Sequence, residues 1–107
     1  MKHLIWGLLA AVAFFAPGKQ TFTGVISDDM CAKGDHSEMR MGPTDAECVA
    51  ACVSTHDAVY VLYDGKAVYT LSDQRTPAQF AAQKVTVTGT LDPSTTTIKV
   101  ESIRATK

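Results

Sequence analysis

The sequence predicts a mainly β domain with two short helices, namely a small five-stranded OB-like barrel with a loop–helix insertion after strand 1. Five runs of the chain are rich in β-branched and aromatic residues or alternate between apolar and polar residues, as strands do. Turn residues separate the paired runs, and two capped segments interrupt the series. A five-stranded meander with two helices on one face is the alternative fold. The five runs are Gln20–Ser27, Ala58–Tyr63, Ala67–Leu71, Lys84–Leu91 and Thr97–Ile103.

The turns between these runs fit two hairpins. Asp64-Gly65 separates the second run from the third, and this pair favours a tight hairpin turn with positive φ. The segment Asp92–Ser94 contains a proline and turns the chain between the last two runs. Gly24 lies inside the first run, where a glycine indicates a bulge or a bend.

A first helix is predicted from Asp45 to about Ser54. The tetrapeptide Thr44–Glu47 is a capping box, in which the threonine hydroxyl accepts from the backbone of the third helical residue. Apolar residues at helical spacing form a stripe that we expect to face the core. The stripe consists of Ala46, Val49, Ala50 and Val53.

A second short helix is predicted to begin at Thr76, between the third and fourth runs. Thr76 would cap it, Pro77 would occupy its first position and Gln79 would complete the capping box. Phe80 is the expected anchor of this helix in the core.

The first eighteen residues have the pattern of a cleavable secretory signal peptide. Lys2 and His3 precede the apolar run Leu4–Ala16, and small residues suit cleavage after Ala13 or Gly18. The run is shorter than the roughly 20 residues that span a bilayer. We therefore predict residues 1–18 as signal peptide, residues 19–107 as one periplasmic or secreted domain, and no stable membrane span after cleavage. A short N-terminal membrane anchor is the alternative.

The charge and motifs of the mature chain exclude several functions. Removing Lys2 leaves nine of the ten Lys and Arg residues against eleven Asp and Glu residues, a net charge of −2. A chain with no basic stripe is a poor partner for nucleic acid. It contains no phosphate-binding loop and no Ser-His-Asp order, so we predict a non-enzymatic protein. A domain of about 90 residues often needs a disulfide or a metal to stabilise its small core.

The unusual feature of the sequence is a cluster of cysteine, histidine and methionine. Cys48 and Cys52 are four residues apart on the first predicted helix, so their thiols share one face and suit a common metal better than a mutual disulfide. Cys31 and His36 come from the preceding loop and complete a Cys₃His set. Such a set fits zinc, and nearby thioethers would also suit copper. Those thioethers belong to Met30, Met39 and Met41.

Two other roles for the cysteines remain open at this point. An exported domain oxidises cysteines readily, so Cys31 could form a structural disulfide with Cys48 or Cys52. A thiol oxidoreductase is the third reading, because Cys48 lies near a helix start that favours the thiolate. Asp28 resembles one member of a catalytic carboxylate pair with Asp29, but a turn role is the better interpretation.

The same residues carry a resemblance to known proteins. The segment Gly24–Cys31, then His36, the Cys-x-x-x-C pattern of Cys48 and Cys52, and the hairpin Tyr60–Lys66 resemble a group of small exported bacterial proteins. Their domains share G-x-[IV]-x-D-x-x-C, a following histidine and C-x-x-x-C, and have no assigned activity. The latter half is similar to periplasmic OB-fold proteins of the stress-induced kind. The resemblance implies an exported OB-like fold and singles out the four residues without giving them a role.

These observations lead to one functional expectation and its rivals. We expect an exported binding module that holds a transition metal, zinc or copper, at Cys31, His36, Cys48 and Cys52. Its partner would be a metal ion or a small ligand, and not nucleic acid. The alternatives are a disulfide-stabilised envelope or extracellular binding domain without metal, and a thiol oxidoreductase.

Overall fold

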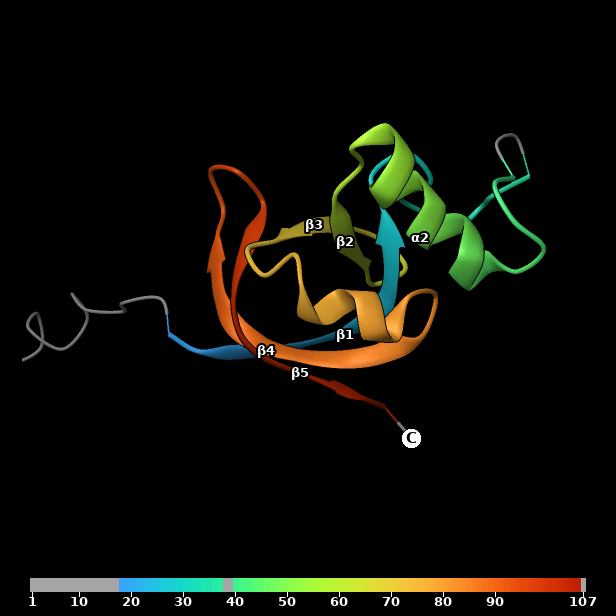
Figure 1. The fold of residues 1–107 in the computed structure, drawn as a ribbon. Helices are drawn as coiled ribbons and strands as arrows, with labels where there is room; N and C mark the ends of the chain where they lie inside the picture. Colours follow the sequence, from blue (N-terminus) through green and yellow to red (C-terminus); the bar gives the residue numbers. More distant parts are fainter. Residues whose placement is uncertain (1–17, 38–39, 107) are drawn as a thin grey trace, which may run out of the picture.

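The computed structural model describes residues 18–37 and 40–106 (Figure 1). The predicted signal peptide lies outside this part except for Gly18, and so does Met39. Among the described residues, no helix has both the length and the apolar character needed to cross a membrane.

The described residues form five strands, one α-helix and one 3₁₀ helix. The mainly β prediction is therefore confirmed, and each of the five predicted runs overlaps a strand. The prediction of two short helices is imprecise, because the second one is a 3₁₀ turn. In chain order the elements are β1 (Gln20–Asp28), α2 (Asp45–His56), β2 (Tyr60–Tyr63), β3 (Val68–Leu71), η2 (Thr76–Phe80), β4 (Lys84–Asp92) and β5 (Thr97–Ala105).

The strands form one sheet that closes on itself in the order β1-β2-β3-β5-β4 (Figure 1). The long strand β1 pairs with β4 over Gln20–Val25 and with β2 over Val25–Asp28, antiparallel in both cases. A short parallel pairing of β3 with β5 closes the ring. The predicted antiparallel pairing of β4 with β5 is confirmed.

Gly24 lies where β1 passes from one partner strand to the other. The residue is buried, and a Cβ atom at this position would collide with the backbone carbonyl oxygen of Tyr63. Glycine is thus required because the backbones of β1 and β2 approach closely here. The same constraint acts at Gly89, next to an irregularity in the pairing of β4 with β5, where a Cβ atom would meet the carbonyl oxygen of Lys99.

The main core fills the inside of the ring and the space beneath the helices. Side chains that point inward from alternate positions of the strands make up most of it. Phe80 of η2 packs against this core, as expected. The buried members are Ile26, Val49, Tyr60, Leu62, Leu71, Ala81, Val85, Val87 and Ile98.

The helix α2 begins as the sequence predicts. The hydroxyl of Thr44 accepts a hydrogen bond from the backbone N–H of Glu47 at 3.1 Å. The helix continues to His56, two residues beyond the expected end, and Asp57 terminates it in the left-handed conformation with φ of 56°.

The buried face of α2 differs from the predicted stripe. Ala46 and Ala50 are exposed, while the residues of α2 that are buried are Cys48, Val49 and Cys52. The small alanine side chains gain little from burial, whereas the two thiols and Val49 fit the space against β1. The predicted stripe is therefore wrong at both alanines, and the cysteines form the inner face instead.

The turn at Thr76 is also built differently from the prediction. The first residue of η2 is Thr76 itself, and the N-cap position, Arg75, makes no side-chain cap. The carboxylate of Asp73 replaces it by accepting from the backbone N–H groups of Arg75 at 2.8 Å and Thr76 at 3.0 Å. Asp73 thus supplies the cap that the sequence assigned to Thr76.

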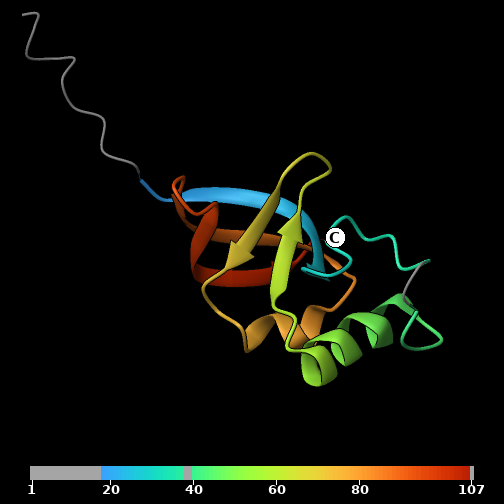
Figure 2. The same cartoon turned by 90° about the horizontal axis from the view of Figure 1, so that it is seen from above.

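The loop and α2 together form an insertion between β1 and β2. Both views place α2 outside the ring of strands (Figures 1 and 2), and the helix packs against β1. The two ends of the insertion are held together, since Asp29 and Val59 exchange two hydrogen bonds of 3.0 and 3.1 Å. The insertion therefore leaves and rejoins the sheet at one point.

The closure of the ring can be tested at Ile98, which is fully buried and pairs with Leu71 across the parallel contact and with Leu91 across the hairpin. We expect Ile98→Ala to lower the free energy of unfolding by about 2–5 kcal/mol, because it leaves a cavity where three strands meet. The exposed neighbour offers a control, and Lys99→Ala should change stability by no more than about 0.5 kcal/mol. Urea denaturation measures both, and equal effects of the two variants would contradict the closed ring.

Candidate metal site

Asp28, the last residue of β1, fixes the turn that follows. Its Oδ1 accepts hydrogen bonds from the backbone N–H groups of Met30 at 3.0 Å and Cys31 at 2.9 Å. The hydroxyl of Ser27 donates to the carbonyl oxygen of Cys31 at 2.7 Å. The predicted turn role of Asp28 is confirmed, and the turn brings Cys31 back beside the end of β1.

A second turn then returns the chain to the same place. The N–H of Gly34 donates to the carbonyl oxygen of Cys31 at 2.8 Å, and the φ of Gly34 is 79°. A glycine adopts such a positive φ without strain. The turn carries His36 inward, to the side chains of Asp28 and Cys31.

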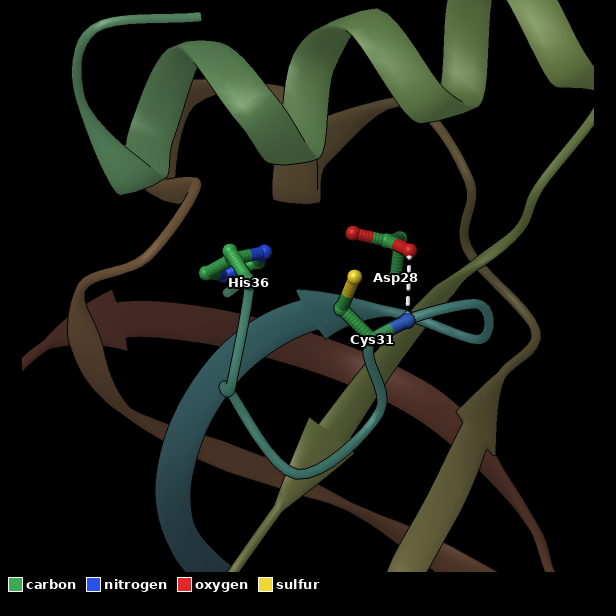
Figure 3. A group of neighbouring side chains, drawn as sticks. All are labelled: Asp28, Cys31 and His36. Atoms are coloured by element: carbon green, nitrogen blue, oxygen red, sulfur yellow. Dashed lines mark hydrogen bonds between the residues drawn. The ribbon is translucent and has the colours of Figure 1, made fainter. Parts of the chain in front are cut away.

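Asp28, Cys31 and His36 form one compact buried group. One potential ligand atom from each lies within 4.8 Å of the other two. Their residues are 0, 8 and 4% exposed, respectively. Figure 3 shows the carboxylate, the thiol and the imidazole gathered between the loop and the helix above it. Three chemically different donor groups are thus brought together out of contact with bulk solvent.

Two buried polar atoms of this group lack a hydrogen-bond partner among the described residues. Within the described part of the chain, Oδ2 of Asp28 and Nδ1 of His36 are buried and have no hydrogen-bond partner. A buried polar atom without a partner costs about 1–3 kcal/mol, and more if it is charged. Both atoms lie beside the Cys31 thiol, and each carries a lone pair that a cation could accept.

The group fits a metal ion in chemistry and nearly in geometry. Carboxylate oxygen, imidazole nitrogen and thiolate sulfur are all zinc ligands, at about 2.0–2.3 Å from the ion. Those distances place the ligands of a tetrahedral site roughly 3.3–3.8 Å apart. The ligand atoms of Asp28, Cys31 and His36 all lie within 4.8 Å of one another, so small side-chain movements would bring them to these distances.

Cys48 and Cys52 project from α2 into the same buried region, together with Ala58. The backbone N–H of Met41 donates to Sγ of Cys48 at 3.3 Å. The Cys48 thiol interacts with the thiols of both Cys31 and Cys52. The shared helix face predicted for the two cysteines is thus confirmed, although neither belongs to the compact group of three.

The environment suppresses ionisation of two thiols. Burial raises the pKa of Cys31, and the charge of Asp28 and the neighbouring Cys48 raise it further. Burial raises the pKa of Cys52 to about 11, and the same carboxylate adds to the effect. Reactive cysteines have a lowered pKa and partial exposure. These two thiols therefore do not suit a redox nucleophile, whereas a cation at the site would reverse the electrostatic effect.

The structure thus brings Cys31 and His36 together and keeps Cys48 and Cys52 at the border of the site. No disulfide joins the three cysteines, all of which lie in the described part of the chain. Sequence reasoning missed Asp28 as a candidate ligand because its turn role explained it fully. The signal was the aspartate three residues before Cys31, which makes a cysteine and a carboxylate neighbours once the turn forms.

The two described methionines of the predicted cluster differ in their distance from the candidate site. Met30 is 44% exposed and lies on the surface. Met41 is partly buried and packs against the cluster of Cys48, Cys52 and Ala58. Of the two described methionines in the cluster, only Met41 is therefore placed near the thiols.

The match to a known protein family covers four of the five strands of the ring and leaves the candidate site outside. Residues 59–106 match a family model described as "Protein of unknown function (DUF5818)". No curated protein and no solved structure matched the chain. The matched span runs from just before β2 to the end of β5, so it contains none of Asp28, Cys31, His36, Cys48 and Cys52.

The suppressed ionisation of Cys52 can be measured. In reduced, metal-free protein at pH 8, alkylation of Cys52 by iodoacetamide should be at least about 100-fold slower than that of a free cysteine, because the raised pKa lowers its thiolate fraction about tenfold per pH unit. The rate should rise with pH until about pH 11. Mass spectrometry of the alkylated peptide gives the rate, and urea-unfolded protein is the control. Equal rates in the folded and unfolded protein would contradict the buried site.

Proposed function

We propose that this chain is an exported binding module that holds a transition metal, zinc or copper. Asp28, Cys31 and His36 would form the centre of the site, with Cys48 and Cys52 beside it. The observation that carries the proposal is the pair of buried atoms, Oδ2 of Asp28 and Nδ1 of His36, that have no hydrogen-bond partner among the described residues. A bound cation would satisfy both atoms at once and favour the thiolate of Cys31.

The ion would also support the fold. The loop after β1 contributes Cys31 and His36, and the helix contributes the adjacent thiols. A site built from such separate segments is organised only in the folded state, so the free energy of metal binding adds to folding stability. A bound metal would thus supply the additional stabilisation that a domain of this size often requires.

The arrangement of the strands supports an OB-like barrel as the scaffold. The strand order β1-β2-β3-β5-β4 and the parallel closure of β3 on β5 agree with five strands rolled into a Greek-key barrel. OB-folds use the connections between strands 1 and 2 and between strands 4 and 5 for ligands. The candidate site lies in the first of these connections, where a binding function would be expected.

Export rests on the pattern of residues 1–18 and on the resemblance to small exported proteins. Under this proposal, cleavage after Ala13 or Gly18 releases a periplasmic or secreted domain. An oxidising compartment also favours a second candidate, a binding domain stabilised by a disulfide in place of a metal. The observation in its favour is that the Cys48 thiol interacts with the thiols of Cys31 and Cys52.

One preparation tests export and metal binding together. Protein recovered from the periplasm of a secreting host should have an intact mass that lacks everything up to Ala13 or Gly18. Elemental analysis should find one zinc or copper ion per chain. Chelation should destabilise the domain, and restoring the ion at 100 times its dissociation constant should raise the free energy of unfolding by about 2.7 kcal/mol.

The variants and the pH dependence sharpen this test. Cys31→Ser and His36→Gln should weaken binding, while His56→Gln, at the exposed end of α2, should not. Affinity should fall as the pH drops, by up to about tenfold per pH unit for each proton that binding releases, because thiol and imidazole ligands bind without their protons. A full-length cytoplasmic chain would refute export. A metal-free chain that reductant destabilises and chelator does not would favour the disulfide.

A further inference from the structure

The three central donors differ in chemical hardness, and this difference limits which ion they can hold. Asp28 offers a hard oxygen, His36 a borderline nitrogen and Cys31 a soft sulfur. Sites for Cu(I) collect thiolates and thioethers, whereas sites for Mg²⁺ and Ca²⁺ collect oxygens. A mixed set of this kind matches a borderline divalent ion such as Zn²⁺.

The placement of Met30 also gives no support to Cu(I). The thioether of Met30 lies on the surface, since this residue is 44% exposed. The buried position closest to Cys31 along β1 is held instead by the carboxylate of Asp28, whose Oδ2 lacks a partner in the described chain. A soft ion would gain nothing from that oxygen, whereas a divalent ion would gain a charged ligand.

A fourth donor is available from α2. Cys48 interacts with the Cys31 thiol, and its sulfur accepts the N–H of Met41 at 3.3 Å. An amide N–H aimed at a cysteine sulfur stabilises the negative charge that a metal-bound thiolate retains. Cys48 has this N–H support and also shares a side-chain hydrogen bond with Cys31, so Cys48 is the better candidate for the fourth ligand.

The burial of all four groups indicates a closed site. Asp28 and Cys48 are 0% exposed, and His36 and Cys31 are nearly as buried. No pocket reaches them in the described part of the chain. Structural zinc sites use four protein ligands, whereas catalytic sites keep one position open for water or substrate. The burial of these four residues therefore resembles that of a structural zinc site.

We infer that the ion is a zinc-class divalent cation, held in a closed four-coordinate site by Asp28, Cys31, His36 and Cys48, with Cys52 outside the coordination. This inference rests on the proposed function and goes beyond it in the class of ion, the ligands and the absence of an open position. The ion would fasten the loop after β1 to α2.

Cobalt(II) is a suitable probe because its visible spectrum reports coordination. Reduced, metal-free protein should bind one Co²⁺ with the intense absorption of a tetrahedral site and a thiolate charge-transfer band, and Zn²⁺ should displace it. When Zn²⁺ and Cu(I) are present at equal concentrations, the protein should retain Zn²⁺.

Paired variants test the ligand assignment. Asp28→Asn keeps the Oδ1 that holds the turn and removes the charge on the partnerless oxygen. It should weaken Co²⁺ binding by more than the roughly 10–100-fold that loss of a supporting group costs. The adjacent Asp29→Asn is the matched control and should leave the affinity unchanged. Cys48→Ser should reduce the charge-transfer band, whereas Cys52→Ser should preserve it.

The outcomes separate this inference from the proposed function. Binding of Cu(I) alone, an octahedral Co²⁺ spectrum, full affinity in Asp28→Asn, or equal effects of the two cysteine variants would each overturn the inference while leaving a metal-binding protein. Absence of any metal from the unmodified chain would overturn both. If circular dichroism shows that a variant has not folded, the Co²⁺ spectrum and the Zn²⁺–Cu(I) competition of the unmodified chain decide the question.

Discussion

The carboxylate of Asp28 connects the scaffold of this protein to its candidate site. One oxygen accepts the N–H groups of Met30 and Cys31 and so determines how the chain turns at the end of β1. The other oxygen is buried beside Cys31 and His36 without a partner in the described chain. The turn places the thiol next to the carboxylate, and burial of the second carboxylate oxygen is costly while it has no partner.

The ring of strands and the insertion have different sources of stability. The ring encloses a continuous apolar core and closes through the parallel contact of β3 with β5. The insertion buries a smaller cluster made of two thiols and Ala58, and its two ends are tied by Asp29 and Val59. A cluster with so little apolar surface contributes little hydrophobic stabilisation, so a metal ion would have its largest effect on this segment.

The match to a family of unknown function follows the same division. It covers residues 59–106, which form most of the ring, and it begins after the insertion. The strands β2 to β5 are therefore the part of the chain that is similar to the family. The residues that we propose as metal ligands lie in the part that the match does not reach.

Local patterns in the sequence were sufficient for the strands and for the start of α2. Alternation predicted β4 and β5, and the capping box predicted Thr44 as the N-cap. The orientation of α2 could not be predicted, because the alanines and the cysteines offer similar apolar surfaces and only the contact with β1 decides between them. Asp73 capped η2 from three residues upstream, which a search centred on Thr76 does not detect.

The candidate site was predicted only in part, because its geometry also depends on tertiary contacts that the sequence does not show. Spacing identified Cys31, His36, Cys48 and Cys52, but it could not rank them, because distances across the loop depend on two turns. Asp28 had a sufficient local explanation in its turn hydrogen bonds. Its second role became visible only when the burial of its other oxygen and of His36 Nδ1 was known.

X-ray absorption spectroscopy at the zinc edge of the loaded, reduced protein tests the central claim most directly. The account predicts a first shell of two sulfur atoms at about 2.3 Å and two lighter atoms at about 2.0–2.2 Å, from Cys31, Cys48, His36 and Asp28. Replacing Asp28 by asparagine should alter the light-atom shell and leave the sulfur shell in place. A shell of three or four sulfur atoms, or one without sulfur, would contradict the account.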